Sequence, residues 1–212
     1  MLLFKIAKTL DPTRCVLSDE TIMKYHKKGL LIENEIREEQ IQPNSIDLTL
    51  GSTWKKLKPN VLTKGNTRSI DPKKILEYES GEFLTCDESG NVVSPYYVLQ
   101  PGEFILMASR EILNIPNGIL SFVQGRSSIA RLAIQTEQAG LIDSGFRGTI
   151  TLEVFNQSQF PIILYEGMRI AQVYFFKSQY ARYLYSQEKG SKYKDQIEAN
   201  GSKIYMDKDL RK

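Results

Sequence analysis

Short stretches in which apolar and polar residues alternate dominate the chain from residue 45 onward. The first, at 45–50, alternates strictly and stops at Gly51, which is typical of a strand with one buried face. Similar runs follow at 104–108, 119–123, 148–155, 160–164 and 170–176. Turn dipeptides such as Pro101-Gly102 and Glu166-Gly167 separate them. Because almost no helical periodicity intervenes, the pattern predicts a mainly β fold of the sandwich or jelly-roll type.

One short helix is predicted near the N-terminus. Ser18 can cap this helix, and Asp19 and Glu20 suit the positive end of the helix dipole. Gly29 provides a stop. These signals place the helix at about 18–29.

The chain of 212 residues is long enough for one domain, which we place at 1–176. Within this domain, residues 52–98 show no clear period, and we expect an irregular insertion that contains a hairpin. Residues 177–212 contain many Lys, Tyr, Ser and Gln residues and few aliphatic ones. This composition predicts a tail that is disordered or that folds only over a partner or a ligand.

Cysteine and histidine are too rare for several kinds of site. The chain has two cysteines and one histidine, whereas a zinc site needs three or four such ligands. A triad with histidine as the base would need His26, which stands in a lysine-rich run typical of a solvated helix face. The 28 basic and 25 acidic side chains give a net charge of +3, which does not favour a nucleic acid partner.

The N-terminal segment does not resemble a targeting signal. Residues 1–8 contain two lysines among the apolar residues, which is too interrupted for a signal peptide. The sequence has no apolar run near the roughly 20 residues that span a bilayer. We therefore expect a soluble, cytoplasmic protein without a membrane partner.

The densest polar cluster follows the run at 119–123. It reads Gln124-Gly125-Arg126-Ser127-Ser128-Ile129-Ala130-Arg131. Arginine forks and the free N–H groups at the start of a helix both favour phosphate, so the cluster is a candidate anion site. It can equally be a surface turn whose arginines are solvated.

A second cluster, at 139–148, centres on a tight turn that contains Asp143 and Phe146. In a simple hairpin turn, Asp143 would bond to its own backbone. In a binding site, Asp143 would instead accept a sugar hydroxyl, and Phe146 would pack against a planar ring. The residues alone leave both interpretations open.

Glu153 is the one acid within the run at 148–155. Ile150, Leu152 and Val154 share one face of the predicted strand, and Glu153 lies on the other. If the second face is open to solvent, Glu153 is an ordinary surface acid. If that face lines a cavity, desolvation favours the protonated carboxyl group, and Glu153 can exchange a proton near neutral pH.

Taken in order, the three clusters resemble the motifs of the dCTP deaminase branch of the dUTPase-like superfamily. The resemblance also covers 42–51, 167–172, the string Ser191-Lys192-Tyr193 and Gln196. It implies a distorted jelly roll, or dUTPase-like β-barrel, assembled as a homotrimer with active sites at subunit interfaces. It also implies hydrolytic deamination of cytosine without zinc, in which Mg²⁺ is bound only through the nucleotide triphosphate.

The resemblance implies catalytic roles for four residues. Glu153 matches the general base and acid, which takes a proton from the water that adds to C4 of the pyrimidine. Arg131 and the backbone carbonyl of Ala139 match the groups that orient this water. Ser127 matches a hydroxyl close to the reacting centre.

Further positions match substrate contacts in the family. Asp143 matches the acid that accepts the deoxyribose 3′-hydroxyl, and Phe146 matches the aromatic ring that packs on the sugar. The implied phosphate contacts are Arg126, Ser128, Tyr185, Lys192 and Gln196.

The main function that the resemblance implies is deamination of the substrate dCTP to dUTP and ammonia. The alternatives are a bifunctional enzyme that forms dUMP and pyrophosphate, a plain dUTPase, and a non-catalytic nucleotide-binding protein. Arg131 and Glu153 are deaminase features and argue against the plain dUTPase.

Overall fold

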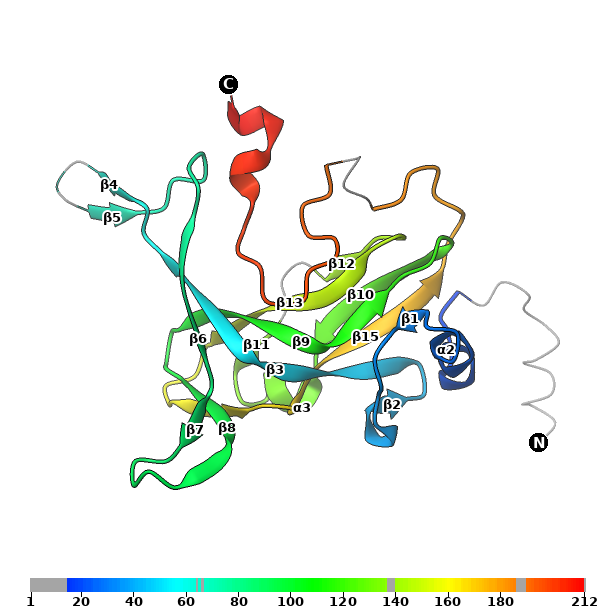
Figure 1. Ribbon diagram of the computed structural model, residues 1–212, viewed down its shortest axis with the longest axis horizontal. Coiled ribbons are helices and arrows are strands. Elements are labelled where there is room, and N and C mark those ends of the chain that lie inside the picture. Colours follow the sequence, from blue (N-terminus) through cyan, green and yellow to red (C-terminus); the bar gives the residue numbers. More distant parts are fainter. Residues whose placement is uncertain (1–14, 64, 66, 137–139, 186–189, 212) are drawn as a thin grey trace.

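The structure is a computed structural model, which describes residues 15–63, 65, 67–136, 140–185 and 190–211. A curled antiparallel sheet forms the centre of the protein (Figure 1). Its strands lie in the order β11-β13-β9-β3-β15-β10-β12. Their bounds are β3 (Ser45–Lys58), β9 (Phe104–Asn114), β10 (Ile119–Gly125), β11 (Ile134–Gln135), β12 (Leu141–Ile142), β13 (Arg147–Asn156) and β15 (Arg169–Lys177). The prediction of a mainly β fold is confirmed.

Shorter elements extend and flank this sheet. β1 (Leu31–Ile32) pairs with β9, and β2 (Ile41–Gln42) and β6 (Glu77–Glu82) pair with β3. A second sheet has the order β14-β8-β7, and β4 pairs only with β5. These strands span Val61–Thr63 (β4), Thr67–Ser69 (β5), Leu84–Cys86 (β7), Val92–Leu99 (β8) and Ile162–Tyr165 (β14).

The helices are short. They are α2 (Asp19–His26), α3 (Ser127–Ala130) and the 3₁₀ turns η1 (Glu38–Gln40), η3 (Ile204–Met206) and η4 (Lys208–Arg211). Within the described ranges, no helix has the length and apolar character needed to cross a membrane.

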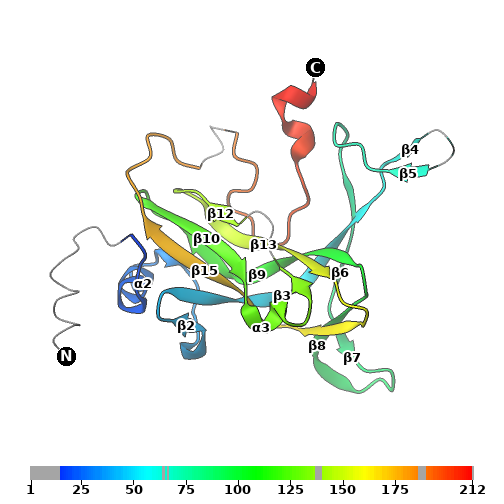
Figure 2. The same ribbon diagram turned by 180° about the vertical axis from the view of Figure 1, so that it is seen from behind.

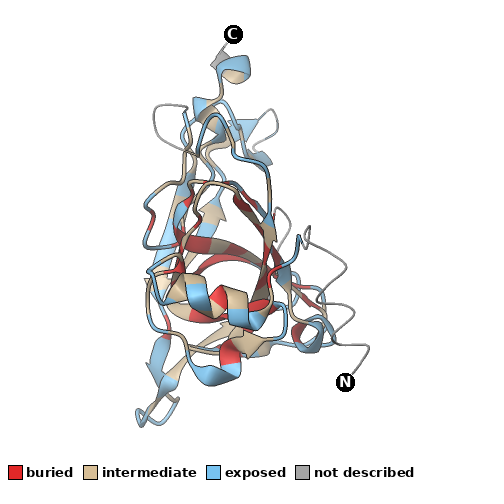
Figure 3. Ribbon diagram, turned by 90° about the vertical axis from the view of Figure 1, so that its right-hand side faces the viewer, coloured by how far each residue is buried: buried red, intermediate tan, exposed pale blue. Residues whose placement is uncertain are grey.

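Buried residues gather inside the curl of the sheet (Figure 3). Leu48, Met107, Leu152, Val154 and Val173 come from four different strands and are all fully buried. Because side chains alternate along a strand, each of these strands turns its intervening residues to the other face of the sheet. One such face of β13 carries the candidate site described below.

The N-terminal helix is shorter than predicted. α2 begins at Asp19, and Ser18 makes no side-chain capping bond to the backbone; its hydroxyl lies 3.3 Å from Oγ1 of Thr21 instead. The helix ends at His26, before Gly29, which has a φ of +69°. Glycine adopts this left-handed conformation readily, so Gly29 marks the turn that follows the helix rather than its last residue.

Residues 52–98 are more regular than the irregular insertion that we expected. β3 continues to Lys58, and β4 to β8 follow. β6 and β7 have no fully buried residue, so they lack the two-residue period that identifies a strand with one buried face. β4 and β5 pair as a hairpin that projects beyond the end of β3 (Figure 1).

Glu103 links the second sheet to the main one. Its Oε1 atom accepts hydrogen bonds from the hydroxyl of Tyr97 and from Nζ of Lys56, both at 2.8 Å. Its Oε2 atom accepts a bond of 2.8 Å from the N–H of Gln100. Burial acts to raise the pKa of the Glu103 carboxyl, but the bonds from Lys56, Gln100 and Tyr97 together outweigh it and hold the pKa below its usual value.

The described part of the tail folds against the chain's own sheet. Gly148 and Gln196 form a parallel bridge in which the N–H of Thr149 donates to the carbonyl oxygen of Gln196 at 2.9 Å. Ala199 is buried against Leu106 of β9. These backbone and apolar contacts hold the described part of the tail against the sheet, and the covering of a nucleotide by residues 177–212 stays a prediction.

Candidate active site

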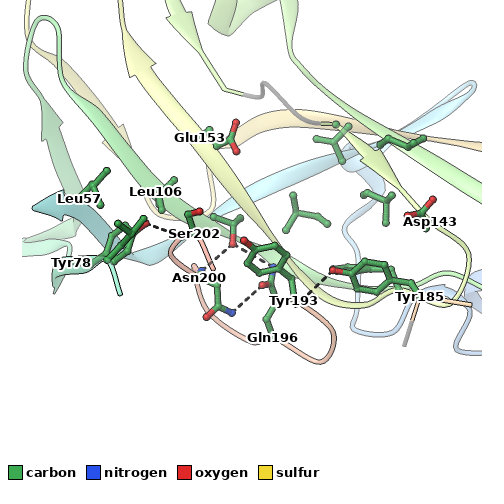
Figure 4. A pocket seen from close by; sticks show the side chains of 18 of the residues that line it. Leu57, Tyr78, Leu106, Asp143, Glu153, Tyr185, Tyr193, Gln196, Asn200 and Ser202 are labelled. Atoms are coloured by element: carbon green, nitrogen blue, oxygen red, sulfur yellow. Dashed lines mark hydrogen bonds between the residues drawn. The ribbon is translucent and has the colours of Figure 1, made fainter. Parts of the chain in front are cut away.

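A cavity of about 490 Å³ lies between β13 and the tail (Figure 4). This volume is within the range of small-molecule sites. Three groups of side chains line it: an acid on β13, a polar end beside the turn after β12, and an apolar end formed by β3, β6 and β9. The tail closes the cavity with Tyr193, Gln196, Asn200 and Ser202.

Glu153 lies on the face of β13 that lines the cavity. Its neighbours Leu152 and Val154 are fully buried in the core, so the strand's alternation turns Glu153 to the other side. A bulge between Thr149 and Thr151 shifts the register of β13 against β9. The sequence left open whether Glu153 faces solvent or lines a cavity, and the structure shows that it lines a cavity.

The polar end of the cavity holds Asp143, Phe146 and Tyr185. The N–H of Phe146 donates to the carbonyl oxygen of Asp143 at 3.2 Å, which closes the tight turn predicted here. The rings of Phe146 and Tyr185 pack at a centroid separation of 5.7 Å. Burial raises the pKa of the Tyr185 hydroxyl, so this end presents an uncharged phenol beside one exposed carboxylate.

Gln196 uses its carboxamide within the chain. Its Nε2 atom donates to the carbonyl oxygen of Thr149 at 2.7 Å and to Oγ1 of Thr151 at 3.3 Å. Its Oε1 atom accepts from Nδ2 of Asn200 at 2.9 Å. Thr151 stands in the third cluster of the sequence but had no role assigned to it there, and Asn200 belongs to none of the clusters. Only the docking of the tail on β13 brings the two residues together.

The apolar end is formed by Leu57, Leu76, Tyr78, Phe104 and Leu106. The hydroxyl of Tyr78 accepts a bond of 2.8 Å from the N–H of Ser202. Burial raises the pKa of Tyr78, which keeps this hydroxyl protonated and the end uncharged. Sequence periodicity did not reveal this group, because three separate strands and a loop supply it.

The residues of the first polar cluster do not line this cavity. Ser127, Ser128 and Arg131 are exposed on and after α3. None of these three residues lines the cavity. In Figures 1 and 2, α3 lies below the main sheet and the C-terminal end of the chain lies above it. Ala139, the fourth residue with an implied catalytic role, lies outside the described residues.

Asp47 is fully buried and holds two arginines. Its Oδ2 atom forms an ion pair with Nε of Arg126 at 3.2 Å and accepts a hydrogen bond from Nη1 of Arg169 at 3.1 Å. Its Oδ1 atom accepts from Nε2 of Gln172 at 3.0 Å. A buried carboxylate is tolerated when it is paired in this way, and the pairing fixes the Arg126 guanidinium at the surface. The sequence showed Asp47 only as a polar residue within an alternating run.

Lys192 also lies apart from the cavity lining. Its Nζ atom pairs with the carboxylate of Asp207 at 2.5 Å. Among the described residues, no group of three or more His, Cys, Asp or Glu side chains lies close enough to hold a metal ion.

A model of the dCTP deaminase-like family matches residues 16–178. A protein from Sulfurihydrogenibium sp. is 35% identical over 196 residues, which are 92% of this chain and 99% of that one. A protein from Dictyoglomus thermophilum is 38% identical over 196 residues, or 91% of this chain and 96% of that one. Both are named "dCTP deaminase, dUMP-forming".

A solved structure supports the same relationship. The crystal structure of 2′-deoxycytidine 5′-triphosphate deaminase from Agrobacterium tumefaciens superposes with a TM-score of 0.59 and 26% identity. The match covers 78% of this chain and 49% of that one, so this chain spans about half of the solved protein.

The names of the two relatives contradict one expectation from the sequence. The main function implied there ended at dUTP, whereas both relatives are named for forming dUMP. The expectation of dUTP as the product is therefore wrong. Simple and bifunctional deaminases share the motifs quoted above, so those motifs did not separate the two products.

Proposed function

Because the chain belongs to the dCTP deaminase family, we propose that it converts dCTP to dUMP, releasing ammonia from the base and pyrophosphate from the triphosphate. The observation that carries this proposal is that Glu153, Asp143 and Phe146 line one cavity. A nucleotide whose base lies beside Glu153 can then place its sugar beside Asp143 and Phe146.

Glu153 performs the proton transfers of the deamination step. It takes a proton from a bound water, and the hydroxide adds to C4 of cytosine. Glu153 then delivers this proton to the ring nitrogen and carries a second proton from the new C4 hydroxyl to the amino group, so that the C4–N bond breaks, the C4 carbonyl forms and ammonia leaves. Holding the water next to the base removes much of the entropic cost of this addition.

Asp143 is the candidate acid for the second hydrolysis. It stands at the exposed rim of the polar end, where a second water can attack the bond between the α and β phosphates. The triphosphate would carry Mg²⁺, which would neutralise part of the phosphate charge when bound.

A second copy of the chain supplies the missing positive charge. None of the described residues that line the cavity is a lysine or an arginine, although a triphosphate needs cationic partners. Arg126 and Arg169 stand together elsewhere on the surface, and Arg131 is exposed near them. Their separation from Glu153 supports a homotrimer of distorted jelly rolls, in which the arginines of one copy complete the cavity of the next.

The test is a product assay with dCTP and Mg²⁺. We expect ammonia, dUMP and pyrophosphate in equal amounts, measured by anion-exchange chromatography and an ammonia assay. The Glu153→Gln variant should release no ammonia, whereas the exposed Glu88→Gln control should match the wild type. Accumulation of dUTP would overturn the second hydrolysis, and consumption of dUTP alone would overturn the deamination.

A further inference from the structure

The cavity extends past Glu153, away from the end at which the sugar is placed. Figure 4 shows Asp143 and Tyr185 on one side of Glu153 and Leu57, Leu106 and Tyr78 on the other. A nucleoside that spans Asp143 and Glu153 therefore leaves the apolar end empty.

The strand register places this apolar end directly beside the acid. Glu153 on β13 lies opposite Leu106 on β9, and residues opposite each other in an antiparallel pair share a face of the sheet. Two strands further across, Leu57 on β3 lies opposite Tyr78 on β6. Lys55 is the β3 residue directly opposite Leu106, and Leu57 stands two residues further along β3 on the same face. Leu57 and Tyr78 therefore form the row next to Glu153 and Leu106, so the compartment starts beside the place where C4 of the pyrimidine is expected.

The tail gives the compartment its outer wall. Ala199 is buried against Leu106, and Tyr78 packs on the same small cluster. Gly201 approaches the Tyr78 ring so closely that a Cβ atom at this position would clash with it. The N–H of Ser202 donates a hydrogen bond of 2.8 Å to the hydroxyl oxygen of Tyr78. The compartment thus presents mainly carbon atoms, and its two hydroxyl groups, those of Tyr78 and Ser202, each accept a backbone hydrogen bond.

Cytosine carries C5 next to C4, on the edge of the ring remote from the sugar. We propose that the apolar end receives a substituent at C5, so that this chain also accepts 5-methyl-dCTP and other C5-alkylated deoxycytidine triphosphates. This inference rests on the proposed function for the placement of the base. Burial of one methyl group in the compartment strengthens binding by about fourfold.

The additional reaction uses the same two hydrolyses. One water adds at C4 of 5-methyl-dCTP, the C4–N bond breaks, and ammonia leaves, which turns the 5-methylcytosine base into thymine. A second water cleaves the α–β phosphoanhydride, so the products are thymidine monophosphate, ammonia and pyrophosphate. No oxidant or reductant takes part, because both steps are hydrolytic.

The first test compares kcat/KM for 5-methyl-dCTP and dCTP in the wild-type protein. A hydrophobic pocket without room for one extra carbon rejects it by about 10- to 200-fold. We therefore expect the two values to lie within about tenfold of each other, and a larger loss with 5-methyl-dCTP would overturn the inference.

A second test fills the compartment. Leu57→Phe should lower the ratio of the two kcat/KM values, 5-methyl-dCTP over dCTP, by at least about tenfold. Leu84→Phe, on the exposed strand β7 and outside the cavity lining, should leave this ratio unchanged. Leu76→Phe serves the same purpose if Leu57→Phe does not fold. An unchanged ratio in the filling variant would overturn the assigned place of the methyl group.

A binding measurement separates this inference from the proposed function. Calorimetry on the Glu153→Gln variant compares dCTP with 5-methyl-dCTP without any turnover. Equal or tighter binding of 5-methyl-dCTP supports the apolar compartment, and weaker binding overturns it. Failure of the wild type to release ammonia from either nucleotide would instead overturn the proposed function and leave this binding comparison intact.

Discussion

Gln196 donates a hydrogen bond from its side-chain nitrogen to the carbonyl oxygen of Thr149 over 2.7 Å, which joins the tail to β13. The resemblance implied that Gln196 contacts phosphate. Its amide nitrogen is instead shared between Thr149 and Thr151, and its oxygen accepts from Asn200. Gln196 can therefore contact a phosphate only if these hydrogen bonds break. The strength of the same bonds determines how stably the tail is attached to β13.

Replacing Gln196 with alanine should loosen the tail. The variant leaves the buried carbonyl of Thr149 without this donor, so the free energy of unfolding should fall by about 1–3 kcal/mol. Urea unfolding measures this change, and limited trypsin digestion should cleave the tail faster than in the wild type. The exposed Gln159→Ala is the matched control. Equal cleavage rates in Gln196→Ala and the wild type would contradict this account of the tail.

Replacing Glu153 with glutamine should remove ammonia release but not nucleotide binding. Glutamine keeps the shape of the side chain and cannot accept a proton from water, so kcat for dCTP should fall by at least about 10²–10⁴-fold. Calorimetry with dCTP should give an affinity near that of the wild type. Normal turnover in this variant would remove Glu153 from the mechanism.

Replacing Asp47 with asparagine should weaken phosphate binding from a distance. The neutral side chain no longer holds Arg126 and Arg169, and the lost charged bonds should lower the free energy of unfolding by about 1.5–3 kcal/mol. The KM for dCTP should rise, while binding of the nucleoside deoxycytidine should stay the same.

The control for Asp47→Asn is Glu111→Gln. Glu111 is also a buried carboxylate, but its partners are Thr49 and Gln40 rather than arginines. This control should lose stability without a rise in the KM for dCTP. A similar rise in both variants would mean that Asp47 acts only through stability.

The hydrogen bonds of Glu103 should make stability depend on acid pH. The folded protein holds the pKa of Glu103 below its usual value, whereas the unfolded chain has a pKa of about 4.3. The stabilisation by this carboxylate is therefore fully present above pH ~4.3 and is lost as the pH falls through the lower, folded value. Urea midpoints between neutral and acid pH should fall less steeply in Glu103→Gln than in the wild type. Parallel curves for the two proteins, with exposed Glu88→Gln as the control, would show that Glu103 is not the group responsible.

The strands around the site could be predicted from the sequence because their signals are local. Glu153 stands between Leu152 and Val154, which are both buried. Because successive side chains of a strand point to opposite faces, Glu153 must lie on the face opposite to these two residues, irrespective of which strands pair with β13. The turn at Asp143 was equally local. By contrast, β6 and β7 escaped prediction because strands without a buried face have no period to detect.

By itself, the sequence determined the mainly β fold, the family and the face of β13 on which Glu153 lies. Only the tertiary structure decided that this face lines a cavity and that the tail closes the cavity through Gln196. It also decided that Arg126 lies outside the cavity lining, in an ion pair with Asp47. The reason is physical. Alternation within one strand reflects neighbouring residues, whereas a cavity is the space left between segments far apart in the chain, and its shape depends on how all of them pack.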